Sequence, residues 1–284
     1  DDSAQRETEF GMWIRGIGQW GEQDKKDGFI GYDYDTGGLS CGFDWALNPH
    51  VLGGFSLGYA YTDIQGEGQT TSGDLKSTYL SAYGTYFTEK GYLESVLSYG
   101  LQSYDNWRRI AIGAIDRQAF SSHDGHTFSA FLRGGYNFDR RPWVISPYAA
   151  LKYINLSEDA FEETGAGAIN LTISGRDTDS LSSEIGARFQ RVINVSMGAL
   201  VPELSLAWNY DFAIDDRIIT AGFAGSPGTF FPTEAPKIER NSVVVETGIS
   251  LINRSGFTTH IQYAGTFRKS YRDHSILGEL RYEF

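Results

Sequence analysis

The chain has only one cysteine, Cys41, among its 284 residues. A single cysteine cannot form an internal disulfide or supply the paired thiolates of a CxxC metal site. Sparse use of cysteine is compatible with export through an oxidising periplasm. The formal net charge of −12 argues against nucleic acid as a partner, because phosphate binding needs a basic face.

The sequence also has no long apolar segment and no secretory leader. No window approaches the roughly 18 consecutive apolar residues that a membrane-spanning helix needs, and the mean hydropathy is −0.33. The first residues do not form a basic stretch followed by an apolar one, as a signal peptide would. Because the chain begins at Asp1 rather than at Met, we expect a processed or excised part of a longer polypeptide.

Aromatic residues and glycine are what the sequence has in quantity. Phe, Trp and Tyr make up 14% of the residues, and there are 34 glycines. This composition, without long apolar runs, is typical of an all-β protein. It also suits a membrane barrel, since averaging an apolar outer face with a polar lumen hides the membrane signal.

Hydrophobicity alternates with a period of two residues through much of the chain. Between positions 203 and 212 the even positions, beginning with Leu204, Leu206 and Trp208, are large and apolar, and the odd positions are small or polar. This pattern predicts a β-strand with one apolar and one polar face. Applied to the whole chain, it predicts twelve strands, near 10–20, 36–47, 51–62, 75–87, 92–105, 127–138, 143–156, 181–190, 203–212, 242–251, 257–267 and 274–284.

The segment 75–87 has the least clear alternation. Leu75, Tyr79 and Tyr83 compete for the apolar face with Leu80 and Tyr86. The even total of predicted strands is what closed antiparallel barrels of bacterial outer membranes require. Helical periodicity is hard to find, so mixed α/β architectures are disfavoured.

The connections between the predicted strands alternate between short and long. Short turns fall near 48–50, 88–91, 139–142, 194–199 and 253–256, and long polar loops near 21–35, 62–74, 106–126, 157–178 and 213–240. Short periplasmic turns and long extracellular loops are typical of outer-membrane barrels, whereas a soluble β-sandwich has no reason to sort its loops by length. With an even strand number, both chain ends are expected at the periplasmic rim.

The residue types on the two faces also favour a membrane barrel over a soluble β-protein. The non-aromatic face consists of Gly, Ser, Ala and Thr with scattered charges, which suits a crowded and hydrated lumen. Aromatic residues near strand ends resemble the girdles that membrane barrels place at the lipid–water interface. They are Trp20, Trp45, Tyr61, Phe138, Trp143, Phe212, Phe267 and Tyr282.

The last predicted strand ends in an aromatic residue. Folding is expected to use this strand as a free edge. A plainer interpretation is a membrane strand whose final residue happens to be Phe. The outward positions are Ile276, Gly278, Leu280, Tyr282 and Phe284, and the inward positions are Leu277, Glu279, Arg281 and Glu283.

Several short segments share their order and spacing with one family. They are Met12-Trp13-Ile14-Arg15-Gly16, the run 31–39, Gly42-Phe43-Asp44, the run 53–59, Tyr83-Gly84-Thr85-Tyr86, the run 147–151 and Arg281-Tyr282-Glu283-Phe284. Taken together, they resemble the translocator (β) domain of the type Va autotransporters, which belong to type V secretion. The resemblance covers about residues 10–284.

The resemblance implies a twelve-stranded barrel at the C-terminus of a larger secreted polypeptide. An N-terminal passenger would cross the pore, and a helix would lead from it into the first strand. Residues 10–284 would then form the barrel, and Asp1–Glu9 would be the remnant of the linker helix. That stretch lacks the Asn-Asn dipeptide at which one subgroup cleaves itself, so self-cleavage stays open.

The resemblance also implies partners and a signal for assembly. The barrel would be inserted by the β-barrel assembly machinery, helped by periplasmic chaperones, and would contact outer-membrane lipid as a monomer. The terminal strand would be recognised through Phe284, Tyr282, Leu280, Gly278 and Ile276. No cofactor is expected.

Three patterns could indicate catalysis or metal binding. The run 54–58 matches G-x-S-x-G around Ser56, but the hydrolase motif needs a strand-to-helix turn, and here it lies inside an alternating strand. His123 and His126, three residues apart, could chelate a metal weakly, although a solvated loop is the plainer interpretation. His260 is predicted to face the lumen, where a serine partner is not evident.

Charged residues on the predicted inner face are the remaining candidates. Unpaired charges in a narrow lumen would be costly, so these side chains are expected to form ion pairs across the pore or to stay hydrated. They would then set the lumen's shape and hold a polar helix or a moving chain, or simply line a hydrated interior. They are Arg15, Asp44, Glu94, Arg133, Lys152, Glu184, Arg188, Glu203, Asp211, Glu246, Glu279, Arg281 and Glu283.

We therefore expect an all-β, integral outer-membrane barrel of a Gram-negative bacterium, with twelve antiparallel strands. The leading functional hypothesis is secretion or surface display of an N-terminal passenger. Two alternatives from other classes are a porin-like channel for small solutes and an outer-membrane hydrolase. The loop 213–240 could either extend two strands outward or fold over the pore mouth.

Overall fold

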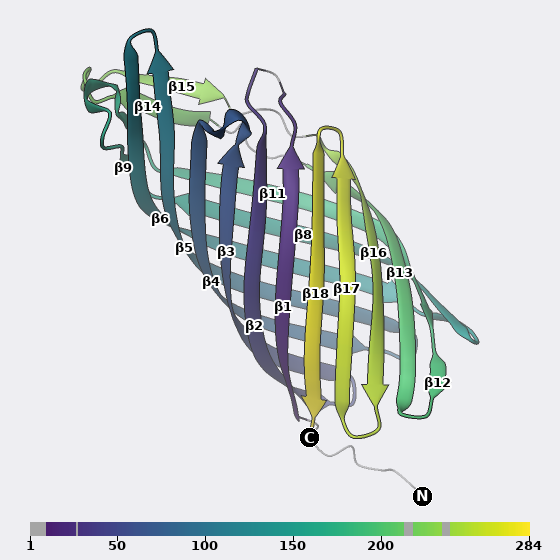
Figure 1. Cartoon of the computed structure of the whole chain (residues 1–284). Coiled ribbons are helices and arrows are strands. Elements are labelled where there is room, and N and C mark those ends of the chain that lie inside the picture. The colour runs from purple at the N-terminus through teal and green to yellow at the C-terminus, as the bar shows by residue number, and fades with distance from the viewer. Residues whose placement is uncertain (1–9, 27, 213–217, 235–238) are drawn as a thin grey trace, which may run out of the picture.

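Twelve long antiparallel strands form one closed barrel in the computed structural model, which describes residues 10–26, 28–212, 218–234 and 239–284 (Figure 1). Each strand pairs with its neighbours in sequence order, and β18 pairs with β1 to close the wall. Among the described residues, no helix is long and apolar enough to cross a membrane. The strands are β1 (Phe10–Gln23), β2 (Tyr32–Asn48), β3 (Val51–Gly66), β4 (Thr71–Phe87), β5 (Gly91–Ile112), β6 (Ile115–Tyr136), β8 (Trp143–Glu158), β11 (Arg176–Arg191), β13 (Gly198–Asp211), β16 (Asn241–Asn253), β17 (Phe257–Arg268) and β18 (Tyr271–Glu283).

The first and last strands meet along their whole length. Met12 lies opposite Tyr282 and Gly16 opposite Gly278, and the backbone N–H of Phe284 donates to the carbonyl of Phe10 at 2.9 Å. Closure leaves no free edge strand, which is how barrels avoid pairing with other chains. The predicted twelve-stranded barrel is therefore confirmed.

Alternation along each strand separates a lipid-facing surface from a lumen. Leu80 and Leu101 are each 60% exposed on the outside, whereas Leu75, Tyr79 and Tyr83 line an internal cavity. The ambiguous segment 75–87 is thereby resolved, with its three competing residues turned inward. Its aromatic lumen face is the reason that the sequence pattern was unclear.

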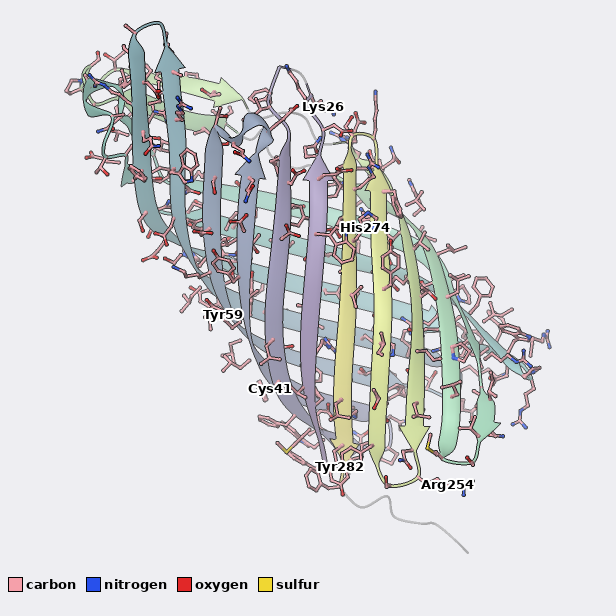
Figure 2. All side chains as sticks on the ribbon, viewed as in Figure 1. Lys26, Cys41, Tyr59, Arg254, His274 and Tyr282 are labelled. Atoms are coloured by element: carbon pink, nitrogen blue, oxygen red, sulfur yellow. The ribbon has the colours of Figure 1, made fainter. Side chains whose placement is uncertain are left out.

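The longest connections all lie on one rim, as predicted, although that rim carries short ones as well. The short-turn rim carries both Phe10 and Phe284 (Figure 1), and the short strands β7 (Phe138–Arg140) and β12 (Ile193–Val195) tighten two of its turns. Short turns identify this rim as periplasmic. Figure 2 shows Tyr282 and Arg254 at this end and Lys26 at the opposite, extracellular one.

The prediction of a loop over 106–126 is wrong. Strands β5 and β6 continue to Ile112 and Ile115 and form a tall hairpin whose turn contains Gly113, at φ 59°. The outward positions of this extension are mostly polar, with Phe120 as an exception, so the apolar alternation that predicts a strand stops at the membrane. The loop predicted over 62–74 is likewise short, since β3 reaches Gly66 and β4 begins at Thr71 after η1 (Glu67–Gln69).

The other two long connections on this rim build a second, four-stranded sheet, which we call the cap. Its order is β15-β14-β10-β9. The described parts of 213–240 thus pair with those of 157–178. In Figure 1 the cap lies at the extracellular end, beside the tall β5–β6 hairpin. Its elements are β9 (Phe161–Glu162), η2 (Gly167–Ile169), β10 (Leu171–Ile173), β14 (Ile218–Phe223) and β15 (Phe230–Glu234).

The cap docks on the inward face of the β5–β6 hairpin. Phe120 and Thr164 exchange two backbone hydrogen bonds of 2.9 and 2.8 Å. Ile110, Ala119 and Ala166 are buried together there, with Ile169 packed against them. The contact between the cap and the hairpin is therefore a small apolar core, like that of a soluble protein, although it lies above a membrane barrel.

Candidate pore

The lumen has one wall of small side chains. Strands β1 to β5, together with residues of β6 and β18, line a cavity of about 700 Å³. Small inward side chains leave this space open while the strand backbones keep all their ladder hydrogen bonds. We call this surface the small-residue wall, and its defining residues are Gly38, Ser40, Ser56, Gly58, Ser77 and Ser81.

An ion pair at the periplasmic end joins the terminal strand to β2. Arg281 donates to both carboxylate oxygens of Asp44, at 2.7 and 2.6 Å, and the Asp44 side chain is only 2% exposed. Tyr83 donates to the same carboxylate at 2.9 Å and receives a hydrogen bond from Trp13 at 2.6 Å. These three hydrogen bonds satisfy the buried Asp44 carboxylate. They offset the cost of removing its charge from water, so the ion pair is stable in this position.

Two glycines make room for this cluster. A Cβ on Gly11 would collide with the Arg281 guanidinium and the Asp44 carboxylate, and one on Gly54 would collide with Tyr83 and Asp44. Both lie on the inward face beside the ion pair. The glycines thus let two long side chains lie flat against the wall instead of filling the channel.

A second ion pair spans the seam at which the barrel closes. Arg15 on β1 lies directly opposite Glu279 on β18 and donates to it at 2.9 and 2.6 Å. The guanidinium also lies over the Trp13 ring, 4.8 Å from its centroid. The two pairs together link β18 to β1 and to β2, and Arg281 also donates to Glu283 at 3.0 Å.

The opposite half of the lumen carries larger polar side chains, and we call it the charged wall. Arg133 donates to Glu94 at 2.7 Å. The Tyr148 hydroxyl donates to Glu184 at 2.9 Å and lies 3.0 Å from the hydroxyl of Ser205. Glu94, Arg133 and Glu184 are therefore held by cross-strand bonds, as the charges of the β1–β18 seam are.

The remaining predicted charges lie in rows along the same wall. Lys152 and Asp211 flank Ser182 in register, and Arg188 and Glu246 flank Ser205. The carboxylate of Glu203 accepts a hydrogen bond from Gln190 at 2.9 Å. Sequence reasoning missed the aromatic members of the lumen, Trp13, Tyr83 and Tyr148, because an aromatic residue in a membrane strand was taken to face lipid.

The serine and histidine patterns do not have the geometry that catalysis or metal binding needs. Ser56 lies inside the uninterrupted strand β3 and lines the cavity, so it is not on a strand-to-helix turn. His123 and His126 belong to β6 rather than to a loop, and they lie an odd number of residues apart on it, so the two rings face opposite sides of the wall. The described residues contain no group of three His, Cys, Asp or Glu side chains that could hold a metal ion.

His260 does have a serine partner, which the sequence did not reveal. Ser250 Oγ lies 2.8 Å from His260 Nδ1, and the Glu203 carboxylate is 4.0 Å from His260 Nε2. The second distance is too long for a hydrogen bond. Ser250 lies within a regular β-ladder, whose N–H groups are already used, so no pair of backbone donors is free for an oxyanion. On this geometry the Ser250–His260 pair has a structural role.

The terminal strand presents apolar side chains to the outside. Phe284 is 68% exposed, and Ile276 and Leu280 are nearly half exposed. The Tyr282 ring lies between Phe257, at 4.6 Å, and Phe284, at 4.7 Å between centroids. An aromatic cluster therefore surrounds the chain end at the periplasmic rim.

The resemblance to a known family extends over most of the barrel. Residues 12–264 match the autotransporter beta-domain family. The chain belongs to the autotransporter β-domain family. An autotransporter β-domain is an outer-membrane translocator barrel, which agrees with the closed wall, the lipid-facing surface and the sorted loops described above.

Curated relatives of this β-domain are much longer proteins. Outer membrane protein A of Rickettsia conorii is 26% identical over 255 residues, which cover 86% of this chain but 12% of that protein. The extracellular serine protease of Serratia marcescens is 22% identical over 96% of this chain and 26% of its own length. The chain thus spans only a small part of the relatives that it matches.

Solved structures show the same fold. The translocator domain of the autotransporter NalP from Neisseria meningitidis matches with a TM-score of 0.80 at 18% identity, covering 99% of this chain and 90% of that one. The transport unit of AIDA-I from Escherichia coli matches with a TM-score of 0.69 at 13% identity, over 100% of this chain and 93% of that one. The barrel architecture is therefore shared across low sequence identity.

Proposed function

We propose that this β-domain secretes or displays an N-terminal passenger through its own lumen. The observation that carries the proposal is the position of Phe10, which is hydrogen-bonded to Phe284 at the periplasmic rim. A segment that precedes β1 therefore starts beside the lumen opening. Because the wall is closed, the lumen is its direct route to the extracellular side.

The two walls of the lumen support different tasks in this proposal. The small-residue wall offers space and hydroxyl groups, against which a polar linker or a moving chain can slide. The charged wall holds some of its side chains through cross-strand hydrogen bonds and places the others opposite one another on neighbouring strands. Its charged residues are Arg133, Lys152, Glu184, Arg188, Glu203, Asp211 and Glu246. The seam pairs formed by Arg15, Asp44, Glu279 and Arg281 keep the barrel closed next to a polar channel. Asp1–Glu9, expected to belong to the linker helix, lies outside the described residues.

The terminal strand supports a proposed role in assembly. Ile276, Leu280 and Phe284 form an apolar stripe at the chain end, with Gly278 and Tyr282 between them. We assign this stripe to recognition by the β-barrel assembly machinery, with periplasmic chaperones delivering the unfolded chain. In this proposal the barrel acts as a translocator.

A secretion assay tests the proposal directly. A signal peptide and an epitope-tagged reporter domain would be joined ahead of Asp1, and reporter at the cell surface would be measured by external protease and antibody on intact cells. We expect surface reporter to depend on the barrel. A folded, heat-modifiable barrel with all reporter left in the periplasm would contradict secretion. Large, stable conductance of the same protein in a planar bilayer would then favour the porin-like alternative.

A further inference from the structure

A stack of three rings joins the cap to the barrel wall. His123 on β6 lies between Tyr104 on β5 and Phe161 on β9. Its ring centroid is 4.6 Å from that of Tyr104, with an interplanar angle of 3°, and 4.1 Å from that of Phe161, at 12°. Phe161 belongs to the first strand of the cap, which follows β8 after two residues. The stack therefore sits where the chain leaves the wall and enters the cap.

The His123 ring is buried and its nitrogens are unsatisfied. The side chain is 4% exposed, and neither Nδ1 nor Nε2 has a hydrogen-bond partner. The nearest carboxylate oxygen, on Glu158 of β8, is 3.7 Å from Nε2. That carboxylate is already engaged by Arg176 of β11 in a bidentate pair of 2.6 and 2.9 Å. Unpartnered polar atoms at such a depth are rare and need a reason.

The surroundings favour the neutral ring. Glu158 and the nearby Asp159 attract a proton, but Arg176 is a cation facing the same site, and burial penalises charge. Burial therefore lowers the pKa of His123 below its usual value. Tyr104 stays neutral, because burial raises its pKa. His123 lies five residues beyond Phe128 toward the extracellular end of β6, and the outward positions on either side of it, Ser122 and Asp124, are polar, so the stack is above the hydrocarbon.

We propose that His123 is an acid-sensitive latch, whose protonation undocks the cap from the β5–β6 hairpin and uncovers the pore mouth. A histidine whose pKa is depressed in the docked state binds its proton more readily once the cap has opened. Docking is therefore fully stabilised by this residue above the ordinary histidine pKa, and that contribution is lost as the pH falls through the lowered value.

Opening the latch would expose a cavity that the cap now covers. A space of about 370 Å³ lies between the cap and the rim, and Ile30, Tyr32, Ile64, Phe161 and Ile173 contribute to its lining. These residues come from β2, β3, the connection before β2 and two strands of the cap, so the cap lies over the part of the rim that runs from β6 to the start of β2. Only the consequence for transport rests on the proposed function, since undocking itself is a property of the fold.

The latch can be tested by distance measurement between two spin labels. One label would be placed at Ser226, in the β14–β15 turn, and the other at Gln65, on the rim, in a Cys41→Ser background and in lipid. Between about pH 7.5 and about pH 5 we expect a longer distance to appear and its population to rise by up to about tenfold per pH unit, because one proton is taken up. This readout does not involve secretion, so it fails or succeeds independently of the passenger.

Substitutions separate titration from packing. His123→Phe keeps the stack but cannot be protonated, so its cap should stay docked across the range. The matched control is His126→Phe on the same strand, an exposed ring that stacks on Tyr99, and it should open as the parent does. Arg176→Gln frees Glu158 to pair with the imidazolium and should reduce the shift. If His123→Phe does not reach the heat-modifiable form, His123→Leu gives the same comparison.

Three results would overturn the latch. They are no change of the distance distribution between the two pH values, the same opening in His123→Phe as in the parent, and tighter docking in acid. The last would mean that Glu158 and the two rings stabilise the imidazolium more than burial and Arg176 disfavour it.

Discussion

The barrel wall and the cap are held together by different forces because they face different solvents. The wall turns its large apolar side chains outward to lipid and lines its lumen with charges, such as the Asp44–Arg281 and Arg15–Glu279 pairs. The cap faces water, so it buries Ile110, Ala119 and Ala166 inward against β5–β6. The wall has no apolar core, and cross-strand bonds and contact with lipid stabilise it. The cap depends on a very small apolar core. The cap is therefore the part of the molecule that is easier to release.

The largest effect is expected from the lipid-facing chain end. Changing Phe284 and Tyr282 together to Ser and Asn removes two aromatic side chains from the outer surface, which costs about 2–5 kcal/mol, in the strand that closes the barrel. We expect most heat-modifiable folded barrel to be lost from outer-membrane fractions. Matched changes of Phe230 and Phe223 in the cap should leave barrel yield unchanged. Equal yields from the two double variants would refute the role of the terminal strand.

The buried seam pair should give the next largest effect. Asp44→Ala leaves Arg281 without its bidentate partner in a largely buried site, and we expect a loss of about 2–4 kcal/mol of barrel stability. Urea unfolding in detergent measures it. The control is Lys76→Ala, which breaks a pair with Asp105 whose side chains are 49% and 47% exposed and should cost far less stability, because exposed ion pairs are screened by solvent. Similar losses in both variants would show that lumen burial does not strengthen the seam.

A smaller and strictly local effect is expected in the cap. Glu163, 7% exposed, accepts two hydrogen bonds from Arg108 at 2.6 and 2.7 Å, so Glu163→Gln should weaken docking by about 1–2 kcal/mol. Limited proteolysis of intact cells should cut the cap faster, with no change in barrel unfolding. Asp116→Asn, which breaks an exposed pair with Arg109, is the control. A fall in barrel stability in Glu163→Gln would mean that cap and wall unfold as one unit.

The smallest effect is expected at the G-x-S-x-G run. Ser56→Ala removes one hydroxyl from the small-residue wall and should change barrel stability by no more than about 0.5 kcal/mol. Secretion of a reporter should be unaffected, and activity toward esters and phospholipids should not change. A selective loss of such hydrolysis in Ser56→Ala would revive the hydrolase alternative.

Much of the wall could be predicted because lipid imposes a strict pattern. Leu204, Leu206 and Trp208 alternate with small residues since each strand has one face in hydrocarbon and one in the lumen. Where a strand leaves the lipid, the alternation ends and the strand can no longer be predicted from it. The β5–β6 hairpin continues beyond the membrane with mostly polar residues on its outer face, so the sequence pattern predicts a loop there. Tyr83 and Tyr148 are aromatic but face inward, where they donate hydrogen bonds to Asp44 and Glu184.

The sequence by itself determined the barrel, its twelve strands, its short periplasmic turns and the outward stripe that ends at Phe284, because these follow from local alternation and turn chemistry. Only the tertiary structure decided which inward charges meet, because Arg281 and Asp44 are 237 residues apart along the chain and the register that joins them exists only once the barrel closes. The same holds for the cap. It assembles from two connections that are distant in sequence, and nothing local to either one indicates that Phe161 will stack on His123.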